Sequence, residues 1–77
     1  LAWGLYQLGR YSEAIEPMER AIELEPEDPI VNDHLGDVLW KVGRKREAYY
    51  QWKKTLLFNP TPELELEIEK KLDTGLQ

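Results

Sequence analysis

The feature that most constrains the fold of this 77-residue chain is an internal repeat, in which the residue at position i matches the residue at position i + 34. Eight residue pairs at this offset are identical or chemically similar, which is too many for coincidence in so short a chain. The pairs are Leu5 and Leu39, Leu8 and Val42, Gly9 and Gly43, Arg10 and Arg44, Glu13 and Glu47, Ala14 and Ala48, Ile22 and Leu56, and Pro26 and Pro60. A period of roughly 20–50 residues indicates a stack of similar units, because one unit cannot bury its apolar face alone.

Apolar residues within each unit recur three and four positions apart, which is the spacing of one helix face. Val31, Leu35, Leu39 and Val42 form one such stripe, and Gly43 follows it as a turn residue. Start and stop signals divide the chain into five helices, of which the first is incomplete. We expect these helices at residues 1–8, 12–24, 29–42, 46–58 and 62–72, with a stop at residue 75.

Three side chains are expected at helix starts. Ser12, Asp28 and Thr61 can each accept a hydrogen bond from the free N–H groups there. Pro29 follows Asp28 at the first helical position, where its missing N–H costs nothing. Pro17 lies inside the second predicted helix, where it removes one hydrogen bond and can bend the helix.

Gly36 lies inside a helical pattern, although glycine there costs about 1 kcal/mol relative to alanine. We interpret it as the point where the backbone of the returning helix passes close by, with Ala48 as the contacting residue. Trp52 lies on the inner stripe of that returning helix and is expected in the core. The two helices on either side of residue 43 therefore form a tightly packed pair.

Composition excludes several functional classes. The net charge of −5 argues against a general affinity for nucleic acid or anionic lipid. Cysteine is absent and His34 is the only histidine, so neither a metal site nor another cofactor is expected. No apolar run approaches the ~18 residues of a membrane span. Because the chain opens in mid-pattern, we expect it to be a fragment of a longer protein.

Ten residues occupy positions that define a known repeat pattern. They are Gly9, Tyr11, Ala14, Ala21 and Pro26 in the first unit, and Leu35, Gly36, Gly43, Ala48 and Pro60 in the second. With them the chain resembles the C-terminal end of a tetratricopeptide repeat (TPR) array, and residues 32–43 resemble the last repeats of long bacterial TPR proteins. Asn32, Lys45 and Thr55 depart from the pattern, which has Trp, Tyr and Ala there.

The resemblance implies an all-α fold, a right-handed TPR superhelix of antiparallel helix pairs. Residues 1–26 would be a partial repeat, residues 27–60 a complete repeat, and residues 61–77 a C-terminal capping helix and tail. The compartment stays open between the cytoplasm and the bacterial cell envelope.

The resemblance also implies a non-catalytic scaffold for protein–protein interaction. In this family the first helix of each pair lines a concave groove that holds a peptide or a partner's helix. The last helix is aligned by a 33-residue register, since its preceding link is one residue shorter. Carried over residue by residue, the groove positions are Trp3, Tyr6, Gln7, Ile30, Asp33, His34, Asp37, Trp40, Lys41, Glu63, Leu66, Glu67 and Lys70.

These groove positions hold four carboxylates and two lysines beside aromatic side chains. Family members that clamp a chaperone's C-terminal carboxylates use Lys, Asn and Arg at positions that here hold Trp3, His34, Glu63 and Glu67. We therefore expect no carboxylate clamp. The expected partner is a peptide of basic or mixed charge with an apolar anchor.

Groove binding is not the only function to which these residues could point. Asp33, His34 and Asp37 could suggest acid–base chemistry, but no nucleophile is near and an open solenoid has no enclosed pocket, so an enzyme is not expected. One alternative is a purely structural cap that seals a longer array. Another is self-association through apolar surface at the incomplete first helix.

Overall fold

The structure is a computed structural model that describes residues 2–76, and every regular element in this range is helical. The elements are α1 (Ala2–Gln7), α2 (Tyr11–Leu24), α3 (Pro29–Lys41), α4 (Lys45–Thr55), a 3₁₀ turn η1 (Leu56–Phe58) and α5 (Pro62–Thr74). The prediction of an all-α chain of five helices is confirmed. Leu1, assigned to the first helix from the sequence, lies outside the described residues.

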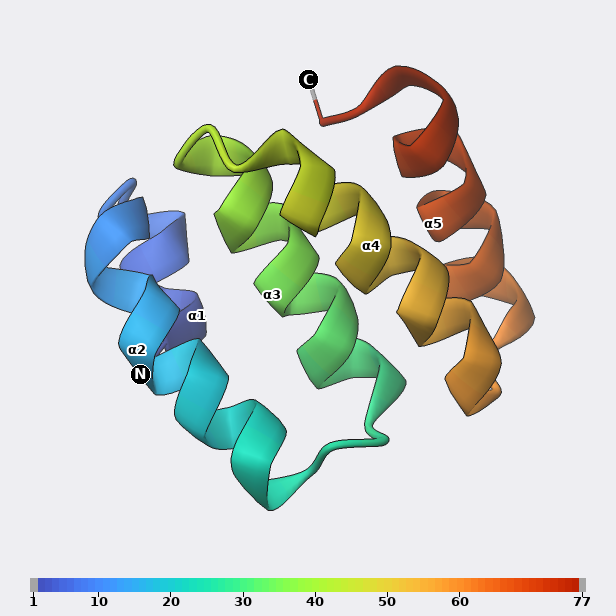
Figure 1. Cartoon of the computed structure of the whole chain (residues 1–77), viewed down its shortest axis with the longest axis horizontal. Helices are drawn as coiled ribbons and strands as arrows, with labels where there is room; N and C mark the ends of the chain where they lie inside the picture. Colours follow the sequence, from blue (N-terminus) through green and yellow to red (C-terminus); the bar gives the residue numbers. More distant parts are fainter. Residues whose placement is uncertain (1, 77) are drawn as a thin grey trace.

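Consecutive helices run antiparallel and are laid side by side (Figure 1). α3 packs against both α2 and α4, α1 packs on α2, and α5 packs on α4. In Figure 1, α1 lies behind α2, while α2, α3, α4 and α5 follow one another across the view. α3 is the central helix and is buried along most of its length, so each hairpin is stabilised by its neighbour in the stack.

The two hairpin turns are built in the same way, as the repeat predicts. Gly9 has φ +79° and Gly43 has φ +90°, a left-handed conformation that favours glycine. The Arg10 N–H donates to the Leu5 carbonyl at 2.9 Å, and the equivalent bond in the next unit, from Arg44 to Leu39, has the same length. This is the Schellman pattern, which satisfies the last carbonyls of the first helix while it reverses the chain.

Two of the three predicted caps are confirmed. Asp28 accepts hydrogen bonds from the N–H groups of Ile30 and Val31, at 2.8 and 3.3 Å. The Thr61 hydroxyl accepts one from the Leu64 N–H at 3.2 Å. Both caps are followed by proline at the first helical position, so the starts of α3 and α5 are determined locally.

The expectation that Ser12 caps α2 is wrong. α2 begins at Tyr11, Arg10 occupies the N-cap position, and no side chain caps the helix. The left-handed glycine brings the chain into helical geometry at once, so the helix starts before the serine is reached. The Arg10 guanidinium instead pairs with Glu13 at 2.6 Å across the first turn.

The core consists of apolar side chains from α2 to α5. Its buried members are Ala14, Met18, Leu35, Val38, Leu39, Ala48, Trp52 and Ile68. Trp52 is fully buried, so its prediction as a core residue is confirmed.

Gly36 is close to a side chain rather than to a backbone. A Cβ atom built at this position would overlap the indole of Trp52. The expected contact with the backbone of the returning helix at Ala48 is therefore corrected: the glycine makes room for a large aromatic ring one turn further along α4.

Candidate functional site

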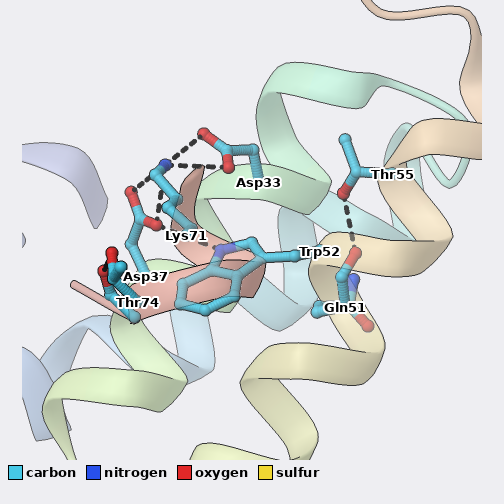
Figure 2. Close-up of polar contacts among 8 residues, drawn as sticks. Asp33, Asp37, Gln51, Trp52, Thr55, Lys71 and Thr74 are labelled. Carbon is cyan, nitrogen blue, oxygen red and sulfur yellow. Dashed lines mark hydrogen bonds and ion pairs between the residues drawn. The ribbon is translucent and has the colours of Figure 1, made fainter. Parts of the chain in front are cut away.

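A buried ion cluster connects α3 to α5 (Figure 2). The Lys71 ammonium lies 2.9 Å from one Asp33 carboxylate oxygen and 3.0 Å from an Asp37 oxygen. The Trp52 indole N–H donates to Asp37 at 3.2 Å. Both aspartates are almost completely buried, so two of the four carboxylates assigned to the groove hold helices together instead of facing solvent.

The cluster has two carboxylates for one ammonium group. Burial, reinforced by the charge of Asp33, raises the pKa of Asp37 to about 6, although Lys71 and Trp52 oppose the shift. Burial acts to lower the pKa of Lys71, but the two aspartates together outweigh it and the net shift is upward. Lys71 is thus held as a cation, and Asp37 is the carboxylate of the cluster that takes up a proton as the pH falls.

Lys71 was not among the residues singled out from the sequence. In the 33-residue register it stands at the position of Val38, a core residue of α3. A lysine at the position of a core valine is the signal that could have revealed it, because a buried ammonium requires a carboxylate partner.

A second polar network joins α3 to α4. The Asn32 side chain donates to the carbonyls of Pro26 and Asp28, and its oxygen accepts from Gln51 at 2.8 Å. The Thr55 hydroxyl donates to the Gln51 carbonyl at 2.7 Å. Within residues 2–76 every buried side-chain polar atom has a partner, so the departures from the repeat pattern at Asn32 and Thr55 are satisfied locally.

Aromatic side chains form the contact between α1 and α3. The Trp3 ring stacks on His34, with centroids 3.7 Å apart, and on Tyr6 at 4.4 Å. Tyr6 in turn meets the edge of Tyr11. Burial lowers the pKa of His34, and burial together with the charge of Asp37 raises the pKa of Tyr6 to about 12. Both side chains are therefore neutral at physiological pH.

A pocket of about 370 Å³ opens between the first turns of α3 and α5. It is lined by Pro29, Ile30, Asp33, His34, Asn59, Thr61, Glu63, Leu64 and Glu67. Five of the predicted groove residues thus come together around one cavity. Ile30 is 56% exposed, which leaves an aliphatic surface free for a ligand.

The other predicted groove residues lie outside this pocket. Trp40 packs against Tyr49 and Trp52, and its ring lies against the backbone of Gly75 after α5. The Lys41 ammonium lies 5.8 Å from the centre of a tyrosine ring. The remaining three are exposed: Gln7, Leu66 and Lys70.

Antiparallel helix pairs that recur with a fixed period along the chain define a helical-repeat protein. The family model described as TPR repeat matches residues 5–43, about half of the chain. The chain therefore belongs to the TPR repeat family, whose members are generally non-enzymatic scaffolds for protein–protein interaction. No curated protein and no solved structure matches it.

Residues 2–76 contain no cluster of three or more side chains suited to hold a metal ion. Over the same range, no helix has both the length and the apolar character that crossing a bilayer requires.

Proposed function

We propose that the pocket between α3 and α5 is the centre of a groove that binds a peptide or an extended segment of a partner protein. The observation that carries this proposal is the convergence of Ile30, His34, Glu63 and Glu67 on one cavity of about 370 Å³. These residues come from the helices whose equivalents line the groove in the TPR family. The exposed residues Gln7, Leu66 and Lys70 would extend the contact surface on either side.

The chemistry of the pocket favours a partner of basic or mixed charge. Ile30 and Leu64 supply aliphatic walls that an apolar anchor of the partner can cover. Burial of this apolar surface contributes favourably to the free energy of binding. Glu63 and Glu67 are exposed carboxylates on α5 that attract lysine or arginine and disfavour an acidic segment. Asp33 contributes less, because both of its oxygens already accept hydrogen bonds from Lys71.

The test is selection of a displayed library of short random peptides on the purified chain. We expect enrichment of peptides in which a basic residue flanks an aliphatic or aromatic one. The double variant Glu63→Lys and Glu67→Lys should reduce the affinity of such a peptide about tenfold or more.

Glu19→Lys and Glu23→Lys provide the matched control, because both residues are exposed on α2 and the change in net charge is the same. Equal loss of binding in the control and in the α5 variant would contradict the proposal, and so would enrichment of acidic peptides that depend on the α5 glutamates.

A structural cap is the second candidate function. Ile68 is the one side chain that α5 contributes to the buried apolar core, and most of the helix surface faces solvent, as a capping helix requires. If α5 only caps the array, reversing the charge of Glu63 and Glu67 should leave every selected peptide bound. Peptide selection therefore separates the two candidates.

A further inference from the structure

A second pocket, of about 380 Å³, lies on the solvent side of α4 and η1. It is lined by Tyr50, Lys53, Lys54 and Leu57, which we call the α4 patch. The buried residues of α4 occupy the opposite stripe of the helix. Tyr50 is 64% exposed and Leu57 is 77% exposed, so two large apolar side chains of one pocket face solvent. The patch shares no residue with the pocket between α3 and α5.

The repeat shows how far this surface departs from its equivalent on α2. The four equivalent positions in the preceding unit are Glu16, Glu19, Arg20 and Glu23. All four are exposed and charged, which is the usual composition of a solvated helix face. On α4 and η1 the same positions carry no carboxylate at all: two glutamates are replaced by Tyr50 and Leu57, and one by Lys53.

The change removes the partner of a cation. On α2, Arg20 forms an ion pair with Glu16 at 2.8 Å. The equivalent pair on α4 is Lys54 and Tyr50, where the ammonium lies 6.0 Å from the centre of the ring. Neither Lys53 nor Lys54 has a carboxylate within salt-bridge distance among residues 2–76. Two cations and two apolar side chains are thus presented together on a chain whose net charge is −5.

We propose that the α4 patch is a docking surface for an acidic segment of a partner protein that carries an aliphatic or aromatic side chain. Carboxylates of the partner pair with Lys53 and Lys54, and its apolar side chain covers the surface between Tyr50 and Leu57. Charge complementarity selects this partner: the patch attracts carboxylates, whereas the acidic pocket between α3 and α5 repels them. The proposal does not depend on peptide binding at that pocket.

Other occupants fit less well. A lipid surface or a nucleic acid requires a wider basic face, because each phosphate contact adds only a small electrostatic gain. Two lysines on an acidic chain do not provide one.

The experiment uses the same displayed library of random peptides on the purified chain. We expect a second enriched group, in which Asp or Glu flanks Leu, Ile or Phe. For a synthetic peptide of this group, Lys53→Glu with Lys54→Glu should weaken binding about tenfold or more, and Leu57→Ser should weaken it about threefold to tenfold. Fluorescence anisotropy of the labelled peptide measures both changes.

The matched control is Arg10→Glu with Arg20→Glu, which changes the net charge equally on exposed positions outside the patch. The variant Glu63→Lys with Glu67→Lys should leave this peptide bound. The experiment can therefore contradict the proposal for the α4 patch without contradicting the proposal for the pocket between α3 and α5, and the reverse. Circular dichroism verifies that each variant is folded.

Three outcomes would overturn the proposal. The first is that no acidic peptide is enriched, or that its binding is unaffected by the Lys53 and Lys54 changes. The second is sedimentation showing a dimer of the unmodified chain that these changes dissociate, since the occupant would then be a second copy. The third is co-sedimentation with phosphatidylserine vesicles that depends on the two lysines. A chain that is monomeric, and that stays in the supernatant when such vesicles are sedimented, supports the peptide partner.

Discussion

The contact from α1 to α3 and the contact from α3 to α5 start from equivalent positions of successive units but differ in chemistry and in the position of the partner residue. Trp3 and Asp37 stand at the same position of successive units. Trp3 contacts α3 by stacking on His34, whereas Asp37 contacts α5 by an ion pair with Lys71. The first contact is aromatic and half-buried, and the second is charged and almost completely buried. The side chain at this repeat position therefore decides which kind of contact its helix makes with the equivalent helix of the next unit.

The same difference extends to the cores of the two hairpins. Met18 in α2 corresponds to Trp52 in α4, and Pro17 corresponds to Gln51. Methionine adapts to its surroundings, and the proline side chain offers no hydrogen bond. Trp52 and Gln51 instead donate hydrogen bonds to side chains of α3. The second hairpin thus has an arrangement determined by directional bonds, whereas the first relies on packing.

The largest expected effect is the loss of the cation that holds α5. Lys71→Ala leaves Asp33 and Asp37 buried without a counter-charge, so the free energy of unfolding should fall by about 3–5 kcal/mol. Urea unfolding followed by circular dichroism measures it. Lys70→Ala is the control, since Lys70 is exposed and should change stability by at most about 0.5 kcal/mol. Equal effects of the two variants would show that the cluster does not hold the helix.

The next effect concerns the space that Gly36 leaves for Trp52. Gly36→Ala introduces a Cβ atom that overlaps the indole and should cost about 2–3 kcal/mol, despite the better helix propensity of alanine. Trp52→Met places at this position the residue found in the first hairpin. In a double-mutant cycle, Gly36→Ala should cost much less in the Trp52→Met background. Simple additivity of the two substitutions would contradict the steric explanation.

A smaller effect is expected from the surplus carboxylate. The folded chain keeps the Asp37 proton up to about pH 6, whereas the reference value is 3.8, so the free energy of unfolding should decrease as the pH rises through this interval. Asp37→Asn should remove that slope and raise stability at neutral pH by about 2 kcal/mol. Urea unfolding at several pH values tests both statements. A slope that persists in the variant would assign it to another group.

The smallest effect is expected at the aromatic contact. Trp3→Leu removes the stacking on His34 and should cost about 1 kcal/mol, with no strong dependence on salt. The His34 ring protons in an NMR spectrum should shift as the ring current of the indole is lost. If the His34 signals did not move in the variant, the stacked contact between α1 and α3 would be contradicted.

Local signals in the sequence were sufficient for the hairpins. Glycine at residues 9 and 43, and Asp28 or Thr61 before proline, act within a few residues of the chain, so their consequences appear where the pattern places them. The prediction of a cap at Ser12 was wrong because two local signals compete there, and the turn geometry at Gly9 starts the helix before the serine. The register of the repeat also selected five residues that the structure brings together around one pocket, although their role in binding stays a prediction.

The period of the repeat, with its apolar stripes, determined an all-helical stack, because each unit can bury its apolar face only against the next. What the tertiary structure alone decided is which polar residues face a neighbour: Asp33 and Asp37 appear on a helix face that the sequence shows as open, and only the approach of α5 covers them with Lys71. The reason is physical. A helical period defines the direction of a side chain relative to its own axis, whereas burial, pKa and ion pairing depend on what the adjacent helix brings to that place.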